Sequence, residues 1–105
     1  MLPEQLKLFV ADRADNMKAT DIIIIDVREK SSITDFMVLC TGNSRSHVSS
    51  IAKHIKDEAR VANIPSFGME GQKEGTWIVL DLIDVILHIM QKEQRQIYQL
   101  EKLWN

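Results

Sequence analysis

Two apolar runs in the second half of the chain constrain the fold more than any other feature. Trp77–Leu82 and Val85–Met90 are each the length of one strand, rich in Val and Ile, and separated only by Ile83 and Asp84. This pattern predicts a tight β-hairpin. Because most side chains in both runs are apolar on both faces, we expect the hairpin to lie inside a sheet that helices cover.

The other segments alternate between helical and strand patterns. We expect helices over 3–18 and from Asn43 or Ser44 to Asn63, strands over 21–27, 36–40 and Ser66–Glu70, and a short amphipathic helix in 91–105 laid across the sheet. These elements predict an α/β fold: one domain over residues 1–105, with a mixed five-stranded sheet flanked by helices in the order α-β-β-α-β-β-β-α.

Three features of the sequence predict how the strands pair. The four consecutive isoleucines in 21–27 favour a central position, because burial on both faces is typical of central strands. The short link from 21–27 to 36–40 indicates an antiparallel pair. The helix between 36–40 and Ser66–Glu70 predicts a right-handed crossover and a parallel pairing of the two strands that it joins.

Composition and charge exclude several classes of protein. The chain carries 13 basic and 15 acidic residues, a net charge of −2, which argues against a protein that holds nucleic acid mainly by neutralising phosphates. No signal peptide is visible, and the longest apolar run is far shorter than the ~20 residues that span a bilayer. We therefore expect a cytoplasmic protein. Cys40 lies in an apolar run, which is typical of a buried, inert thiol.

Few residues suggest chemistry. The turn Gly42-Asn43-Ser44 before a helix could bind an anion, as in nucleotidyltransferases, but the next strand offers only Glu70 where those enzymes hold metal with paired carboxylates. Ordinary helix capping explains the turn better. His47 and His54 are seven residues apart, too far for a shared metal. We therefore predict no catalytic residue, metal ligand or cofactor.

Several polar and aromatic side chains lie in or near the hairpin and the tail. Asp84 fits turn chemistry, whereas Asp81 interrupts an apolar strand and His88 lies alone on an apolar face, as a core or interface histidine does. Trp77 and Tyr98 are equally compatible with a core and with a protein–protein interface. We expect Trp104 to pack on the fold and close the tail.

Three motifs carry a resemblance to a known family. They are Lys30–Gly42, Trp77–Met90 and Arg95–Trp104, in order and covering nearly the whole chain. Together they resemble the ribosomal silencing factor family, also called the Iojap family. The resemblance implies a nucleotidyltransferase-like fold without the catalytic carboxylates. It further implies a non-enzymatic translational repressor that binds the large ribosomal subunit through its ribosomal protein fourteen, and that blocks joining of the small subunit when nutrients are low.

The resemblance and the aromatic pattern together suggest a partner-binding site. We expect six residues to form it, four supplying apolar area and two pairing with polar or basic groups of the partner: Trp77, Met90, Tyr98 and Leu100, with Asp81 and His88. Two alternatives stay open. One is a small nucleotidyltransferase-like enzyme that uses the turn Thr41–Ser44 for phosphate, and the other is a homodimeric scaffold that uses the same apolar face.

One position departs from the family pattern. The family usually has Gly before the turn aspartate, where this chain has Ile83. Gly accepts the positive φ of a two-residue hairpin turn, which a β-branched residue resists. We therefore expect a longer turn or a turn of another type between the two hairpin strands.

Overall fold

The computed structural model describes residues 1–104, so the last residue of the predicted 91–105 helix lies outside the described residues. Within this range the elements are α1 (Pro3–Asn16), β1 (Thr20–Asp26), β2 (Phe36–Thr41), α2 (Arg45–Val61), β3 (Gly68–Glu70), β4 (Trp77–Asp81), β5 (Val85–Met90), α3 (Lys92–Tyr98) and α4 (Leu100–Leu103). None of these described helices combines the length and apolarity that crossing a membrane requires.

The described strands form one mixed five-stranded sheet in the order β1-β2-β5-β4-β3. Strands β2 and β5 are parallel, while β1–β2, β4–β5 and β3–β4 are antiparallel. The predicted α/β class, the hairpin formed by β4 and β5 and the antiparallel pairing of β1 with β2 are therefore confirmed. Strand β5 occupies the middle of the sheet, which explains why its sequence is almost continuously apolar.

The predicted central position of β1 is wrong, because β1 is an edge strand. Its isoleucines are nevertheless covered on both faces. Ile22 and Ile24 pack into the core beneath α1 and α2, while Ile23 and Ile25 pack on the other side with residues of the tail. Burial on both faces thus reports two covering layers and does not require a strand on each side.

The predicted parallel pairing of the third strand is also wrong. Strand β3 lies at the opposite edge and pairs antiparallel with β4, at Met69 opposite Leu80. Chain direction is the correct part of the prediction, since β3 runs the same way as β2. The position beside β2 is taken by β5, because the strongly apolar hairpin gains more by burial in the middle of the sheet than the short polar β3 would.

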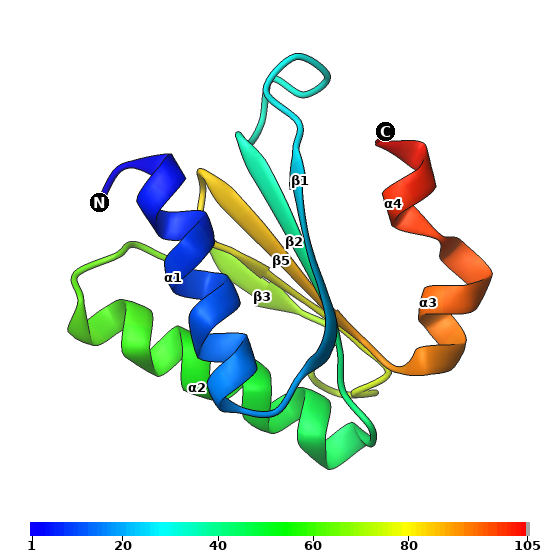
Figure 1. Cartoon of the computed structure of the whole chain (residues 1–105). Coiled ribbons are helices and arrows are strands. Elements are labelled where there is room, and N and C mark those ends of the chain that lie inside the picture. Colours follow the sequence, from blue (N-terminus) through cyan, green and yellow to red (C-terminus); the bar gives the residue numbers. More distant parts are fainter. Residues whose placement is uncertain (105) are drawn as a thin grey trace.

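Helices α1 and α2 cover one side of the sheet, and α3 and α4 lie on the other (Figure 1). Beneath α1 and α2 lies the main core, whose sheet residues include Val38, Leu87 and Ile89, each fully buried. Helix α2 begins as predicted, with Ser44 Oγ accepting a hydrogen bond from the His47 amide at 3.0 Å. Cys40 is buried in this core, as predicted, and burial raises the pKa of its thiol to about 12, which disfavours the reactive thiolate.

The tail builds a second, thinner layer. Leu100 and Trp104 pack against a small cluster on β1, β2 and the residue after β1: Ile23, Ile25, Val27, Met37 and Leu39. This confirms that Trp104 closes the tail. The predicted single helix is divided in two, because Gln99 adopts a left-handed conformation with φ 46° between α3 and α4.

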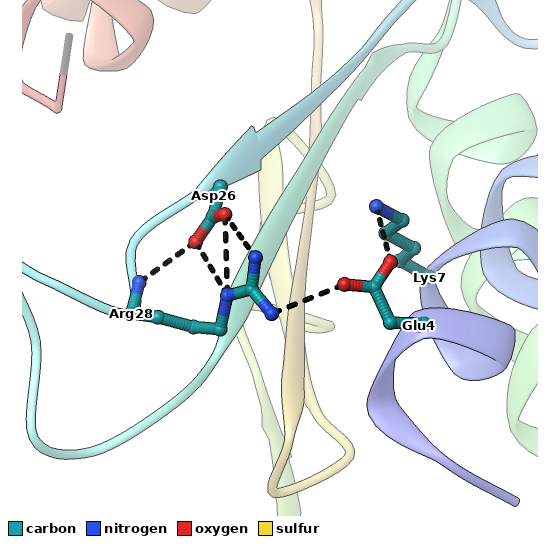
Figure 2. A network of polar contacts seen from close by, with 4 residues as sticks. All are labelled: Glu4, Lys7, Asp26 and Arg28. Carbon is teal, nitrogen blue, oxygen red and sulfur yellow. Dashed lines mark hydrogen bonds and ion pairs between the residues drawn. The ribbon is translucent and has the colours of Figure 1, made fainter.

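A polar network holds the segment after β1 against the start of α1 (Figure 2). The Arg28 guanidinium pairs with Asp26 at 2.6 Å and with Glu4 at 3.1 Å, and Glu4 also pairs with Lys7 at 2.9 Å. The hydrogen bonds from Arg28 hold the pKa of Asp26 at about 2. Both cations also lie over the ring of buried Phe36. The network thus closes the end of the sheet where β1 stops.

Candidate docking face

The strand register places four of the six predicted site residues on one side of the hairpin. In β4 and β5, Trp77 lies opposite Met90, Val79 opposite His88, and Asp81 opposite Ile86. Side chains directly opposite each other in an antiparallel pair point to the same side of a sheet. This side faces away from α1 and α2, because the alternate residues Ile78, Leu80, Leu87 and Ile89 are buried beneath those helices.

An aromatic group forms the centre of this side. The Trp77 indole N–H donates a hydrogen bond to His88 Nδ1 at 3.0 Å, and the Trp77 and Tyr98 rings lie 4.8 Å apart at 48°. A tilted contact at this separation is favourable for two aromatic rings. Helix α3 therefore brings Tyr98 from the tail to the hairpin, and the Tyr98 side of the group is open, since Tyr98 is 51 % exposed.

His88 is neutral in this arrangement. An indole N–H can only donate, so Nδ1 must accept and the imidazole proton must lie on Nε2. Burial lowers the pKa of His88 to about 4, which keeps the ring neutral near pH 7. No hydrogen-bond partner for Nε2 is found within residues 1–104. His88 can therefore offer a neutral N–H donor to a partner, and it does not act as a cation.

Asp81 has a structural role at the hairpin turn. Its Oδ1 accepts a hydrogen bond from the Ile83 amide at 2.8 Å, whereas the turn bond of Asp84 comes from its backbone N–H to the Leu82 carbonyl at 2.9 Å. Turn chemistry expected from the side chain of Asp84 is thus supplied by Asp81. Within the described residues, the second carboxylate oxygen of Asp81 has no hydrogen-bond partner and can accept one.

The turn itself explains how Ile83 replaces glycine. Ile83 has φ 72°, and the bond from the Asp84 amide to the Leu82 carbonyl spans two residues, which is the pattern of a γ-turn. The expected longer turn is not found: the connection stays two residues long, Ile83 itself takes the positive φ, and the strand register is regular from Trp77 to Asp81. A β-branched residue in this region is strained.

The other two predicted site residues, Met90 and Leu100, differ from the four described above, because one is buried and the other lies away from the hairpin. Met90 is 1 % exposed, so it packs beside Trp77 and offers almost no area to a partner in this conformation. Leu100 is partly buried in the cluster beneath the tail. All six predicted residues thus lie on the second side of the sheet, and all of them except Met90 reach its surface at least in part.

Two residues of this side were not predicted as site residues. Val79 and Ile86 are half-buried and lie between Trp77, His88 and Asp81 in the register. Period-two alternation from Trp77 and His88 could have identified both. We define the docking face as the six partly exposed residues that lie on this side of the hairpin or contact it: Trp77, Val79, Asp81, Ile86, His88 and Tyr98.

The turn before α2 uses its polar groups for capping. The Asn43 amide donates to His47 Nδ1 at 2.9 Å, and His47 Nε2 contacts the Met17 carbonyl at 2.7 Å, so His47 joins the start of α2 to the end of α1. In residues 1–104 no group of three or more His, Cys, Asp or Glu side chains could hold a metal ion. The predicted enzyme alternative gains no support from this turn.

Comparison with known proteins identifies the family. The family model described as ribosomal silencing factor during starvation matches residues 2–105. The chain belongs to this family. It is 49 % identical over 96 residues to the ribosomal silencing factor of Haemophilus influenzae, covering 91 % of this chain and 94 % of that protein. The resemblance seen in the three sequence motifs is therefore confirmed.

Two further relatives of this silencing-factor chain extend the comparison. A crystal structure of a Chromobacterium violaceum protein superposes with a TM-score of 0.96 at 28 % identity, covering 99 % of this chain and 87 % of that one. A mouse protein named mitochondrial assembly of ribosomal large subunit protein 1 is 31 % identical over 93 residues, which cover 82 % of this chain and 39 % of that protein.

Proposed function

We propose that this silencing factor binds the large ribosomal subunit in the cytoplasm, through ribosomal protein fourteen of that subunit, and sterically blocks joining of the small subunit. The family description supports a role in silencing ribosomes during starvation. The name of the mouse relative supports the large subunit as the target. The proposal involves no catalysis, and because a steric block needs only occupancy, repression should follow the fraction of large subunits that carry the protein.

The observation that carries the proposal is the open aromatic group of the docking face. The Trp77 and Tyr98 rings lie 4.8 Å apart in a tilted contact, and both reach the surface on the side of the sheet that α1 and α2 leave uncovered. Tryptophan and tyrosine are enriched among residues that dominate binding energy at interfaces. Here they supply apolar area. His88 Nε2 donates to a partner acceptor, and Asp81 accepts from a polar or basic partner group.

The binding experiment compares single variants on and off the docking face. We expect Trp77→Ala and Tyr98→Ala each to weaken co-sedimentation with purified bacterial large subunits by about 30-fold or more, which corresponds to roughly 2 kcal/mol. Leu8→Ala is the control, because Leu8 is an apolar residue of α1 that is 59 % exposed, close to the 51 % of Tyr98, and lies off the docking face. We expect it to bind like wild type.

Two outcomes contradict this assignment. If both aromatic variants stay folded by circular dichroism and bind subunits as tightly as wild type, the docking face lies elsewhere. If Trp77→Ala instead dissolves a dimer seen by analytical ultracentrifugation and leaves subunit binding unchanged, the face serves self-association, as the homodimer alternative predicts.

A further inference from the structure

The charges of α2 are unevenly distributed around the helix. Its exposed cations Arg45, Lys53, Lys56 and Arg60 are spaced by eight, three and four residues, which places them on one stripe. The buried residues of α2, from Val48 to Ala59, occupy a different side. Four cations on one stripe are a local concentration in a chain whose net charge is −2.

The acidic residues of α2 do not neutralise most of this stripe. Glu58 turns toward α1, where its carboxylate accepts a hydrogen bond from Arg13 at 3.2 Å. Among residues 1–104, Asp57 pairs with Arg60 alone, at 3.4 Å. Within the described residues, the Lys53 and Lys56 ammonium groups have no ion-pair partner. They can therefore take an external anion without first breaking an internal contact.

The stripe lies on the helix side of the sheet, opposite the docking face, and it borders the edge of the sheet that β3 forms. Arg45 Nε donates to the Glu74 carbonyl at 2.6 Å, and Lys56 and Arg60 border a surface hollow with Pro65 and Ser66. The segment reached by these contacts carries β3, the edge strand next to β4, and β4 carries Trp77. A large partner that contacts the docking face can thus reach the stripe by extending around the edge that β3 forms.

We propose that this basic flank, formed by Arg45, Lys53, Lys56 and Arg60, contacts RNA phosphates next to the protein partner on the large ribosomal subunit. The inference rests on the proposed function, and the charge of the flank identifies the occupant. Lys53 and Lys56 are one helical turn apart, about 4.5 Å along the axis, and Ser49 on the same stripe can donate a hydrogen bond to a phosphate oxygen. The docking face gives specificity, and the flank adds salt-dependent attraction.

The test is the salt dependence of binding. Fluorescently labelled full-length protein is titrated with purified bacterial large subunits between 50 and 200 mM KCl, and log K is plotted against log[KCl]. The variants are Lys53→Gln, Lys56→Gln and their double combination, all exposed and outside the docking face. Lys18→Gln is the matched control, because Lys18 is an exposed lysine after the end of α1 and carries the same charge.

We expect the slope to become shallower by about 0.7–0.9 for each lysine removed. The double variant should bind subunits about tenfold more weakly or worse at 50 mM KCl, while Lys18→Gln behaves like wild type. Binding to isolated ribosomal protein fourteen should be the same for wild type and the double variant, since that contact lacks RNA.

Two results contradict the RNA contact and leave the proposed function standing. In the first, the double variant binds subunits with the same salt slope and affinity as Lys18→Gln. In the second, the double variant loses affinity for isolated ribosomal protein fourteen, which would mean that the flank contacts a protein. Failure of the proposed function is distinguishable from both: in that case wild type itself does not bind subunits, or binding does not respond to Trp77→Ala.

Discussion

The two sides of the sheet are built by different means. The side under α1 and α2 is closed by fully buried aliphatic residues such as Val38, Leu87 and Ile89. On the other side, a tail of two short helices covers β1 and β2. Over β4 and β5 the residues of that side are half-buried, and an indole–imidazole hydrogen bond joins the two strands.

The two sides of the sheet also differ in whether their buried polar atoms have hydrogen-bond partners. Arg95 Nε and Glu101 Oε2 are the buried side-chain polar atoms without a hydrogen-bond partner in residues 1–104, and both belong to the tail. Unpaired buried polar atoms cost stability. We therefore expect the first side to supply most of the folding free energy.

The sharpest way to separate the two sides is a pair of neighbouring substitutions on β5. Leu87 points to the helix side and is fully buried, whereas Ile86 points to the docking face and is half-buried. We expect Leu87→Ala to lower the free energy of unfolding by about 3 kcal/mol or more, and Ile86→Ala by about 1 kcal/mol. Urea unfolding measures both. Equal losses would contradict a division of labour between the two sides.

The buried imidazole makes the second side sensitive to acid. The pKa of His88 is about 4 in the folded chain, against 6.5 for an ordinary histidine. Below pH 6.5 the unfolded chain takes up a proton that the folded chain does not, so stability falls until pH 4. We expect a loss of up to about 3 kcal/mol in this window.

Comparison with His88→Gln isolates this effect from other titrations. The wild-type free energy of unfolding, measured in urea at pH 7, 6, 5 and 4, should decline relative to that of the variant. Parallel pH profiles for the two proteins would mean that His88 is not held neutral by its environment.

The tail offers an intermediate effect. Trp104 is partly buried on the cluster of the second side, and its carbonyl accepts a hydrogen bond from Lys30 Nζ at 2.7 Å. We expect Trp104→Ala to cost about 2 kcal/mol of unfolding free energy, less than full burial of a tryptophan would imply. Hydrogen exchange should show faster exchange at β1 amides next to the tail. Unchanged exchange there would mean that the tail does not protect this edge.

The smallest expected change is a gain. Ile83 is strained at φ 72°, and glycine accepts that conformation without a Cβ clash. Ile83→Gly relieves about 1–2 kcal/mol of strain, which outweighs the cost of the greater freedom of the unfolded chain, so we expect a net stabilisation of about 0.5–1 kcal/mol. Thermal unfolding by calorimetry should show a higher Tm. A lower Tm would indicate that the exposed Ile83 side chain contributes packing that outweighs the strain.

Local patterns predicted those parts of the fold that local physics decides. Helix α1, the Ser44 cap of α2, the hairpin and the packing of Trp104 follow from spacing, capping and apolar runs. The position of β1 did not follow, because an isoleucine run looks the same whether a helix or a tail covers its second face. The pairing of β3 did not follow either, because β3 and the hairpin compete for the place beside β2. A short stretch of sequence does not include both competitors, so it cannot predict which of them wins.

The sequence predicted which hairpin residues share one side of the sheet, but not their exposure or contacts, and their binding to a partner stays a prediction. Residues Trp77, Asp81, His88 and Met90 share one face by alternation, yet their exposure depends on how the tail lies. The bond from Trp77 to His88 joins residues on two strands, so it fixes a neutral imidazole that sequence alone does not specify. Gln99, which ends α3 and orients the tail, carries no glycine or proline signal.

The most direct test of the central claim is subunit joining. Purified large subunits are first mixed with wild-type protein, with Trp77→Ala or with Leu8→Ala, small subunits and Mg²⁺ are then added, and the mixture is sedimented. We predict that wild type and Leu8→Ala reduce the joined-ribosome peak while Trp77→Ala leaves it intact. A normal joined peak with wild-type protein bound to large subunits would contradict the steric account, and equal inhibition by Trp77→Ala would contradict the docking face.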